Sequence, residues 1–348
     1  ELQSNGKASH ATAGARGPEI RKSLRVPFEH GIHARPAALL ARALRNFTAD
    51  VSALANNRKA NARSAVAWME LGAQRGDEIT LIADGPDAAA ALAALEAAFT
   101  QASPSVPRSP SAFLGVSRLP PEQPEEPRHS EEPVLRGVIA SRGIAIGNAA
   151  LITGAVPLPT ESGAGVAHES TELERARGLV RAQLEQTYAT SSGVAREVVE
   201  AHLSFIDDPE LLQNAEASIA RGKSAGFAWR EAVEESANAL AAVGDPRVAE
   251  RADDLRDLAG QVLRALAGEA TFLDPPPGSI LIGQELLPSQ LVGLPPGRIA
   301  GFCTAAGGPT SHVALLAAAL NLPALVAAGS RVLQIAEGAP LVLDADRG

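Results

Sequence analysis

The sequence predicts a multidomain protein of the α/β and α+β classes, in which a small α+β sandwich precedes an α/β unit with an inserted four-helix bundle. The chain has 348 residues, 45% of them hydrophobic, which is enough for two or three domains with their own cores. Short apolar segments alternate with helical periods in residues 22–101. A long helical stretch, residues 167–268, separates β-like segments in residues 134–166 and 269–348.

The first module alternates strand-like and helical segments. The expected strands are Leu24 to Phe28, Val51 to Ala55 and Ile79 to Ala83, and the expected helices are Pro36 to Phe47, Ser64 to Leu71 and Ala88 to Phe99. Pro36 fits a first helical turn, Ser64 can cap its helix, and Gly72 can end it.

The second module opens with β-like segments between Val138 and Ile152, and four helices are expected from about residue 170 to residue 268. Thr171 and Glu174 form a capping box that predicts the first helix start. The other expected helix boundaries are Asp208-Pro209 and Asp245-Pro246 at starts, and Gly222, Gly244 and Gly268 at ends. Beyond them, strands are expected at Ile280 to Ile282, Ile299 to Phe302, Ala324 to Val326 and Leu341 to Leu343, with one helix at Val313 to Leu320.

Two stretches have the composition of linkers. Residues 1–21 contain Gly, Ala and Ser without an apolar period and are interpreted as a linker remnant. Residues 102–133 repeat Pro and Glu, which predicts a stiff, extended linker. Met69 is the only methionine, and this indicates that the sequence is a piece of a longer protein.

Composition excludes several functions. With 31 basic and 40 acidic residues, the net charge of -9 predicts no affinity for nucleic acid. The single cysteine, Cys303, permits no internal disulfide and no cysteine-rich zinc site, so a cytoplasmic setting and no metal are expected. Cys303 precedes the Gly-Gly turn in an apolar strand and is expected to be a buried packing residue. Asn321 and Pro323 interrupt the longest apolar stretch, so no membrane insertion is expected. Because no Gly-rich loop ends in Lys and Ser or Thr, a nucleotide is not the expected phosphate source.

His33 lies in the segment HGIHARPA, directly before a helix that Pro36 begins. The first N–H groups of a helix lack intrahelical acceptors, so those of Ala34 and Arg35 could bind a phosphoryl group. Arg35 adds a permanent cation, and a neutral imidazole is a usable nucleophile. Taken alone, the segment fits a helix cap with a solvated arginine better than a phosphoryl site.

His312 ends the segment GGPTSH before an apolar helix. Gly308 lets the backbone approach an anion closely, and Thr310 and Ser311 offer hydroxyl donors. A Gly-rich turn with capping hydroxyls explains the segment equally well. The remaining histidines predict no chemistry, since His10, His129 and His168 lie in polar, loop-like sequence and His30 and His202 fit structural or surface roles.

Two groups of segments resemble proteins of the sugar phosphotransferase system. HGIHARPA and KANARSAVAWMELGAQRGDEITLIADG resemble HPr, the histidine phosphocarrier, which has an open-faced β-sandwich fold. RGVIASRGIAIGNA, HLSFIDDPEL, ERADDLRDLAGQVLRAL and AAGGPTSHVALLAAALNLPALV resemble the N-terminal half of enzyme I, an α/β phosphohistidine domain with an inserted helical HPr-binding domain. The two matches cover residues 22–101 and 134–348, and their fusion in this order resembles multiphosphoryl transfer proteins.

The resemblance assigns roles to individual residues. It implies that phosphate passes from phosphoenolpyruvate to Nε2 of His312 and then to Nδ1 of His33. It also implies docking of Arg35, Val66 and Met69 against a helical hairpin. The hairpin residues concerned are Leu203, Phe205 and Ile206.

Three further positions qualify the resemblance. Pro309 stands where enzyme I mostly has Arg, and Leu287 where it mostly has Thr, so each removes a polar neighbour of the active histidine. Ser64 matches a serine that a regulatory kinase modifies in some HPr proteins, but it is explained at least as well as a helix cap.

The resemblance implies a phosphotransferase that drives sugar uptake, with fructose the usual association. Its expected partners are an enzyme IIA, the membrane permease components and the phosphoenolpyruvate-binding barrel of enzyme I. Since the sequence stops about where that barrel would begin, this chain alone is not expected to use phosphoenolpyruvate, and Mg²⁺ is expected only with the barrel. The alternative is a catalytically impaired regulatory binding module on the same folds, disabled by Pro309 and Leu287.

Overall fold

The computed structural model describes residues 19–101, 134–152, 156–269, 273–295, 297–309 and 311–348. These residues form two compact units. The first holds residues 19–101 together with 207–213 and 235–252, and the second holds the other described residues. The predicted linker at 102–133, most of the predicted linker remnant, His10 and His129 lie outside the described residues.

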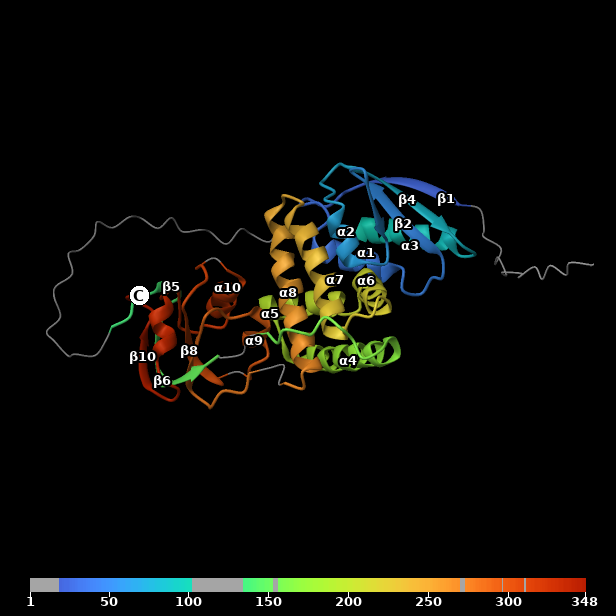
Figure 1. Cartoon of the computed structure of the whole chain (residues 1–348). Coiled ribbons are helices and arrows are strands. Elements are labelled where there is room, and N and C mark those ends of the chain that lie inside the picture. The colour runs from blue at the N-terminus through green and yellow to red at the C-terminus, as the bar shows by residue number, and fades with distance from the viewer. Residues whose placement is uncertain (1–18, 102–133, 153–155, 270–272, 296, 310) are drawn as a thin grey trace, which may run out of the picture. The chain divides into compact units, whose positions relative to one another are not determined.

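The core of the first unit lies between an antiparallel sheet and three helices on one of its faces (Figure 1). The strands are β1 (Ile20–Arg25), β2 (Asp50–Ala55), β3 (Arg58–Asn61) and β4 (Glu78–Asp84), in the order β1-β4-β2-β3. The helices are α1 (Ala34–Ala43), α2 (Ala65–Glu70) and α3 (Ala88–Gln101). Alternate residues of β2 and β4 are buried, as a sheet with one covered face requires. Trp68, fully buried, donates its indole N–H to Ala62 O at 2.9 Å.

Two features of this unit differ from the sequence prediction. Strand β1 runs from Ile20 to Arg25 and not from Leu24 to Phe28 as predicted, so residues 20–21 belong to the sheet and not to a tail. Strand β3 was not predicted. It follows β2 through a two-residue turn in which Asn56 and Asn57 both have positive φ (51° and 59°), the conformation that the favoured hairpin turns require.

Five helices occupy residues 166–266, and not the four that were predicted. They are α4 (Val166–Thr190), α5 (Gly193–Phe205), α6 (Pro209–Ala220), α7 (Ala225–Ala241) and α8 (Pro246–Leu266). The extra boundary lies at Ser191 and Ser192, where the backbone is extended and separates α4 from α5.

The helix boundaries are partly as predicted. The capping box is wrong, because Thr171 lies inside α4 and its hydroxyl donates to Ala167 O. The two aspartate caps are confirmed, since Asp208 accepts from the Glu210 N–H and Asp245 from the Arg247 N–H. Gly222, Gly244 and Gly268 follow helices with positive φ, as predicted for glycines that end helices.

The second unit is built on a six-stranded sheet with the order β10-β6-β7-β8-β9-β5. Strands β6 (Ile144–Leu151), β7 (Ser279–Gly283), β8 (Ile299–Thr304) and β9 (Ala324–Val326) are parallel. The edge strands β5 (Val138–Ser141) and β10 (Pro340–Asp344) are antiparallel to their neighbours. Its remaining elements are α9 (Pro288–Val292), α10 (His312–Ala319) and a 3-10 helix (Ser330–Gln334).

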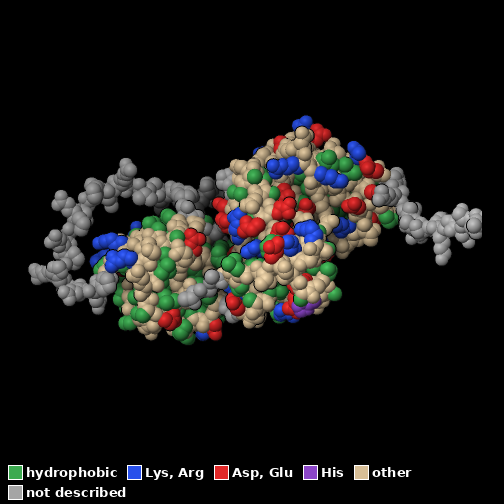
Figure 2. All heavy atoms as spheres, in the orientation of Figure 1, with side chains coloured by type: hydrophobic (Ala, Val, Ile, Leu, Met, Phe, Trp, Pro, Cys, Tyr) green, Lys and Arg blue, Asp and Glu red, His purple; other side chains and the backbone are tan. Residues whose placement is uncertain are grey.

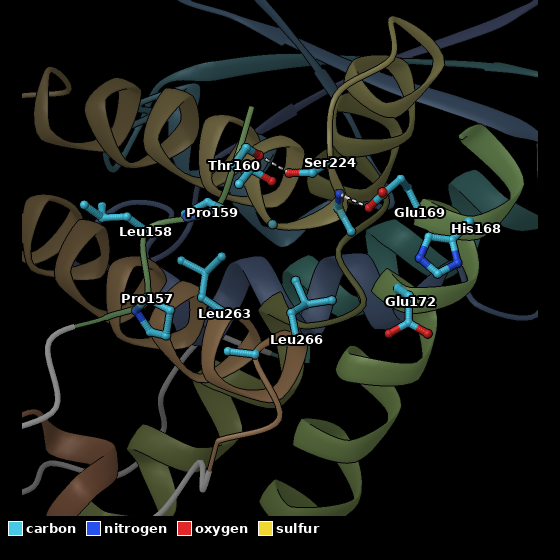
Figure 3. A pocket seen from close by; sticks show the side chains of 13 residues that line it. Pro157, Leu158, Pro159, Thr160, His168, Glu169, Glu172, Ser224, Leu263 and Leu266 are labelled. Atoms are coloured by element: carbon cyan, nitrogen blue, oxygen red, sulfur yellow. Dashed lines mark hydrogen bonds between the residues drawn. The ribbon is translucent and has the colours of Figure 1, made fainter. Parts of the chain in front are cut away.

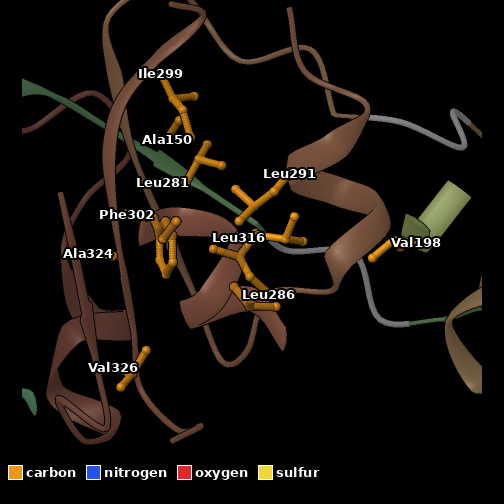
Figure 4. Packing of buried hydrophobic residues seen from close by; sticks show 12 residues of the cluster. Ala150, Val198, Leu281, Leu286, Leu291, Ile299, Phe302, Leu316, Ala324 and Val326 are labelled. Atoms are coloured by element: carbon orange, nitrogen blue, oxygen red, sulfur yellow. The ribbon is translucent and has the colours of Figure 1, made fainter. Parts of the chain in front are cut away.

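Both faces of this sheet are covered by apolar clusters. On one face, Leu281 and Phe302 of the central strands pack with Leu291 of α9 and Leu316 of α10 (Figure 4). The other face holds Ile280, Ile282 and Cys303. Cys303 is therefore buried, as predicted, and burial raises the pKa of its thiol to about 11. In the described part of the chain, none of the helices has both the length and the hydrophobicity needed to cross a membrane.

Candidate functional site

His33 stands at the start of α1, on a loop that a glycine holds in place. Gly31 has φ +68°, and a β-carbon there would lie 2.5 Å from Ala73 O, so the loop requires glycine. The N–H of Ile32 donates to the same carbonyl at 2.9 Å. His33 is the N-cap residue, but its side chain makes no capping hydrogen bond, so the imidazole is not used by the helix.

The surroundings of His33 favour the neutral imidazole. Burial is the largest cause that lowers its pKa, followed by the charges of Arg247, His30, Arg251 and Arg35. A neutral imidazole carries the lone pair that a nucleophile needs. Arg35 is exposed at the second position of α1, where the predicted phosphate-binding role can be met. Arg247 and Arg251 belong to α8, and neither was predicted from the sequence as part of this site.

A buried aspartate connects α2 with the start of α6 inside the first unit. Asp208 is 1% exposed and accepts hydrogen bonds from Ser64 Oγ at 2.7 Å and from the Val66 N–H at 3.1 Å. Ser64 also accepts from the Ala67 N–H at 2.8 Å, which confirms its predicted role as a helix cap. Burial raises the pKa of Asp208, against the lowering effect of these hydrogen bonds.

Carboxylates gather around this contact. Burial and the charge of Glu210 raise the pKa of Glu70, at the end of α2, to about 7, although a hydrogen bond with Ser236 opposes the shift. Burial and the charge of Asp208 raise the pKa of Glu210 in the same direction. The contact between α2 and the start of α6 therefore places several carboxylates close together and away from water. Protonation of these carboxylates reduces their repulsion.

The predicted docking residues fall in both units. Val66 and Met69 are fully buried on α2. In the second unit, Phe205 and Ile206 are fully buried and Leu203 is half-buried. Sequence reasoning missed Asp208 as a docking residue, since the Asp-Pro pair indicated only the cap that it also provides.

His312 lies at the carboxyl edge of the parallel sheet. It is the first residue of α10, which connects β8 to the parallel strand β9. The loops at this edge are tied together, because Ala305 N donates to Gly283 O and Ala328 N to Thr304 O. Helices that follow strands at this edge of an open sheet commonly border ligand sites.

The residues before His312 form a tight helix entry. Ser311 is the N-cap of α10, and its hydroxyl accepts from the Ala314 N–H at 3.3 Å. Of the two roles that the sequence left open for this hydroxyl, phosphate binding and capping, the structure shows the cap. Gly308 accepts from the Ser311 N–H through its carbonyl, and Pro309 is exposed. Thr310 lies outside the described residues.

Leu287 caps α9 without a side-chain hydrogen bond, at the same edge of the sheet. Its N–H donates to Gln290 Oε1 at 2.8 Å. The first turn of α9 is anchored to α8, because buried Asp257 accepts from Ser289 Oγ at 2.6 Å and from the Ser289 N–H at 3.1 Å. These hydrogen bonds hold the start of α9, although an aliphatic residue stands at the cap.

A pocket elsewhere in the second unit is separate from these sites. It lies between the segment Pro157 to Thr160 and helices α4, α7 and α8, and His168, Glu172 and Leu263 line it (Figure 3). None of the predicted site residues belongs to it. His168 lies on α4 and not in the predicted loop-like sequence. In the described ranges, no three or more His, Cys, Asp or Glu side chains are grouped so that they could hold a metal ion.

The two modules carry opposite charge. Residues 21–101 have 10 basic and 8 acidic side chains, whereas residues 134–348 have 16 and 25. On the face shown in Figure 2, acidic side chains gather over the helical region that contains α7 and α8. Such complementarity favours encounter of the modules.

Both folds, and the two histidine segments within them, lie in regions that match family models of phosphocarrier and phosphoenolpyruvate-utilising proteins. Three family models match the chain. They are the PTS HPr component phosphorylation site (residues 20–101), the N-terminal part of PEP-utilising enzymes (136–251) and the mobile domain of PEP-utilising enzymes (275–348).

Similar proteins support the same assignment. A multiphosphoryl transfer protein of Xanthomonas campestris pv. campestris is 32% identical over 93% of this chain and 39% of its own length. One from Rhodobacter capsulatus is 34% identical over 87% of this chain and 37% of its own length. A solution structure of an Enzyme I protein (nEIt) is 30% identical with a TM-score of 0.53, covering 61% of this chain and 90% of that chain.

The chain belongs to the multiphosphoryl transfer proteins of the phosphotransferase system. This confirms the resemblance to HPr and to the N-terminal half of enzyme I. The chain spans about two fifths of the length of the multiphosphoryl transfer proteins described above.

Proposed function

We propose that this chain relays a phosphoryl group from His312 to His33 and on to an enzyme IIA, with phosphoenolpyruvate as the original donor. The observation that carries the proposal is the position of the two histidines. His33 is the N-cap of α1 and His312 is the first residue of α10, and they lie in segments that match the models of the PTS HPr phosphorylation site and of the mobile domain of PEP-utilising enzymes. Helix starts supply unpaired N–H groups to an anion.

The chemistry requires only the two imidazoles and positioned cations. In the first step the lone pair of His312 attacks phosphorus, the P–O bond of the donor breaks and a P–N bond forms. In the second, the neutral imidazole of His33 attacks, the P–N bond at His312 breaks and a new one forms at His33. Positioning and charge neutralisation do most of the work in such transfers.

The expected surroundings of the relay follow from the family. Phosphoenolpyruvate and Mg²⁺ would bind the barrel of enzyme I, and this chain would exchange phosphate with it, with enzyme IIA and indirectly with a membrane permease. Cytoplasmic location and fructose as the sugar remain predictions. A catalytically impaired binding module is the second candidate, and the aliphatic cap at Leu287 favours it.

Two histidine variants test the relay when phosphoenolpyruvate, Mg²⁺, a supplied enzyme I barrel and an enzyme IIA are present. His33→Ala should still take one phosphate on His312 but pass none to enzyme IIA, and His312→Ala should take none from the barrel. His168→Ala, on an exposed part of α4, is the matched control. Phosphate that reaches enzyme IIA from the His33→Ala variant contradicts the relay. A wild-type chain that takes no phosphate but still binds enzyme IIA supports the binding module.

A further inference from the structure

The first turn of α8 is bridged to the His33 loop inside the first unit. Asp245 caps α8 by accepting from the Arg247 N–H at 2.9 Å. The side chain of Asp245 also forms a hydrogen bond with Gln74. Gln74 lies against the loop, because a β-carbon on Gly31 would lie 3.2 Å from its Oε1. Through Gln74, the start of α8 is therefore held against Gly31, which precedes His33 by two residues in the sequence.

This bridge brings cations of the inserted helices to the phosphocarrier histidine. Arg247 and Arg251 are four residues apart on α8, so they project from the same face of the helix. The charges of both act on His33, together with those of Arg35 and His30. Arg247 has a half-exposed side chain, and its Nε lies 3.5 Å from Asp245 Oδ1, a surface ion pair of small energy. Its guanidinium can therefore turn toward a stronger anion at little cost.

We propose that Arg247 is a positioning residue for the phosphoryl group on His33, acting as a second guanidinium in addition to Arg35. The assignment rests on the relay proposed above. A phosphoryl group on imidazole is a dianion with several acceptor oxygens, and the planar fork of a guanidinium matches it. Arg247 stays protonated throughout. The P–N bond at His312 breaks and the one at His33 forms without a proton passing through Arg247.

The assignment gives α8 a direct part in transfer besides its part in docking. With His33 unphosphorylated, the Arg247 charge favours the neutral, nucleophilic imidazole. With His33 phosphorylated, the same charge stabilises the product. When the helical segment is packed on α2, both effects raise the ratio of phosphate on His33 to phosphate on His312.

Arg247→Gln in the full chain tests the assignment, with Arg256→Gln as the matched control. Arg256 lies on the same helix and pairs with Glu234 and Asp253. The pKa of His33, followed by NMR in the unphosphorylated chain, should rise in Arg247→Gln and stay unchanged in the control. The ratio of phosphate on His33 to phosphate on His312 should fall about three- to tenfold. Arg247→Lys should restore the pKa but only part of the ratio, because it keeps the charge and loses the fork.

Exchange protection of the Val66 amide separates positioning from docking. That amide donates to Asp208, so its protection should persist in Arg247→Gln if the helical segment still packs on α2. If both histidines of Arg247→Gln are phosphorylated normally, with the His33 pKa and the phosphate ratio unchanged, the role of Arg247 is overturned but the relay is not. A fall in the phosphate ratio that comes with a loss of Val66 protection also overturns the role of Arg247, because docking is then lost. A wild-type chain that accepts no phosphate overturns the relay itself.

Discussion

Asp208 shows what a single residue can and cannot reveal in the sequence. The Asp-Pro pair predicted a helix cap, and Asp208 does accept from the Glu210 N–H. Its second role, accepting from Ser64 and Val66, joins residues more than 140 positions apart. No local pattern specifies such a contact, because it depends on how two separate parts of the chain pack.

Replacing Asp208 should destabilise the first unit. Asp208→Ala leaves the Ser64 hydroxyl and the Val66 N–H buried without their acceptor, which costs roughly 1–3 kcal/mol in the free energy of unfolding. Urea denaturation of the full chain measures the change, and Asp253→Ala, 81% exposed, is the control. Equal stability of the two variants contradicts the described contact.

Gly31 should be irreplaceable beside His33. A side chain there meets both a positive φ and a carbonyl at 2.5 Å, whereas Gly76 has φ +90° with open space around it. Gly76→Ala should cost about 1 kcal/mol from backbone strain alone, and Gly31→Ala clearly more. Thermal unfolding compares the two variants. Similar midpoints indicate that the close approach to Ala73 is not required for folding.

At the scale of elements, helices and buried strands were foreseen better than short connections. Apolar periodicity located α1, α3 and α10 within a few residues, because each buries one continuous face. Strand β3 has only four residues and a polar sequence, so it carries no comparable signal. The Asn56-Asn57 turn was the signal that could have found it.

The end of α2 should make stability depend on pH. Glu70 has a raised pKa of about 7, mainly through burial, against a usual value of 4.5. Between these values the folded chain keeps a proton that the unfolded chain has lost. The free energy of unfolding therefore falls as pH rises through this window, by about 2–3 kcal/mol.

Glu70→Gln should remove most of that slope, and Glu29→Gln, at an exposed position, should keep it. Urea denaturation at several pH values between 4.5 and 8 gives the slopes. The remaining slope of Glu70→Gln should have the same sign, because the pKa values of Glu210 and Asp208 are raised too. A variant slope equal to the wild-type slope contradicts the role of Glu70.

At the scale of the whole molecule, the sequence located the two family segments because their motifs are continuous in the chain. It could not locate the cations around His33, since Arg247 and Arg251 lie more than 200 residues further along. The His312 segment was recognised as a helix start, but the sequence left Ser311 open as a cap or as a phosphate ligand, because that choice depends on backbone geometry.

The opposite charges of the modules should make transfer sensitive to salt. Raising the ionic strength from about 0.05 M to about 0.5 M should slow transfer from His312 to His33 several-fold, because screening weakens attraction between the +2 and -9 modules. Rapid-quench analysis measures this step separately from loading of His312. A transfer rate that does not change with salt argues against electrostatic steering.

The most direct measurement for the relay is peptide mapping by mass spectrometry after incubation with phosphoenolpyruvate, Mg²⁺ and a supplied enzyme I barrel. The account predicts acid-labile phosphate on both His33 and His312, with phosphate on His33 lost when His312 is replaced by Ala. Phosphate on neither histidine, in the presence of a barrel shown to be active, would contradict it.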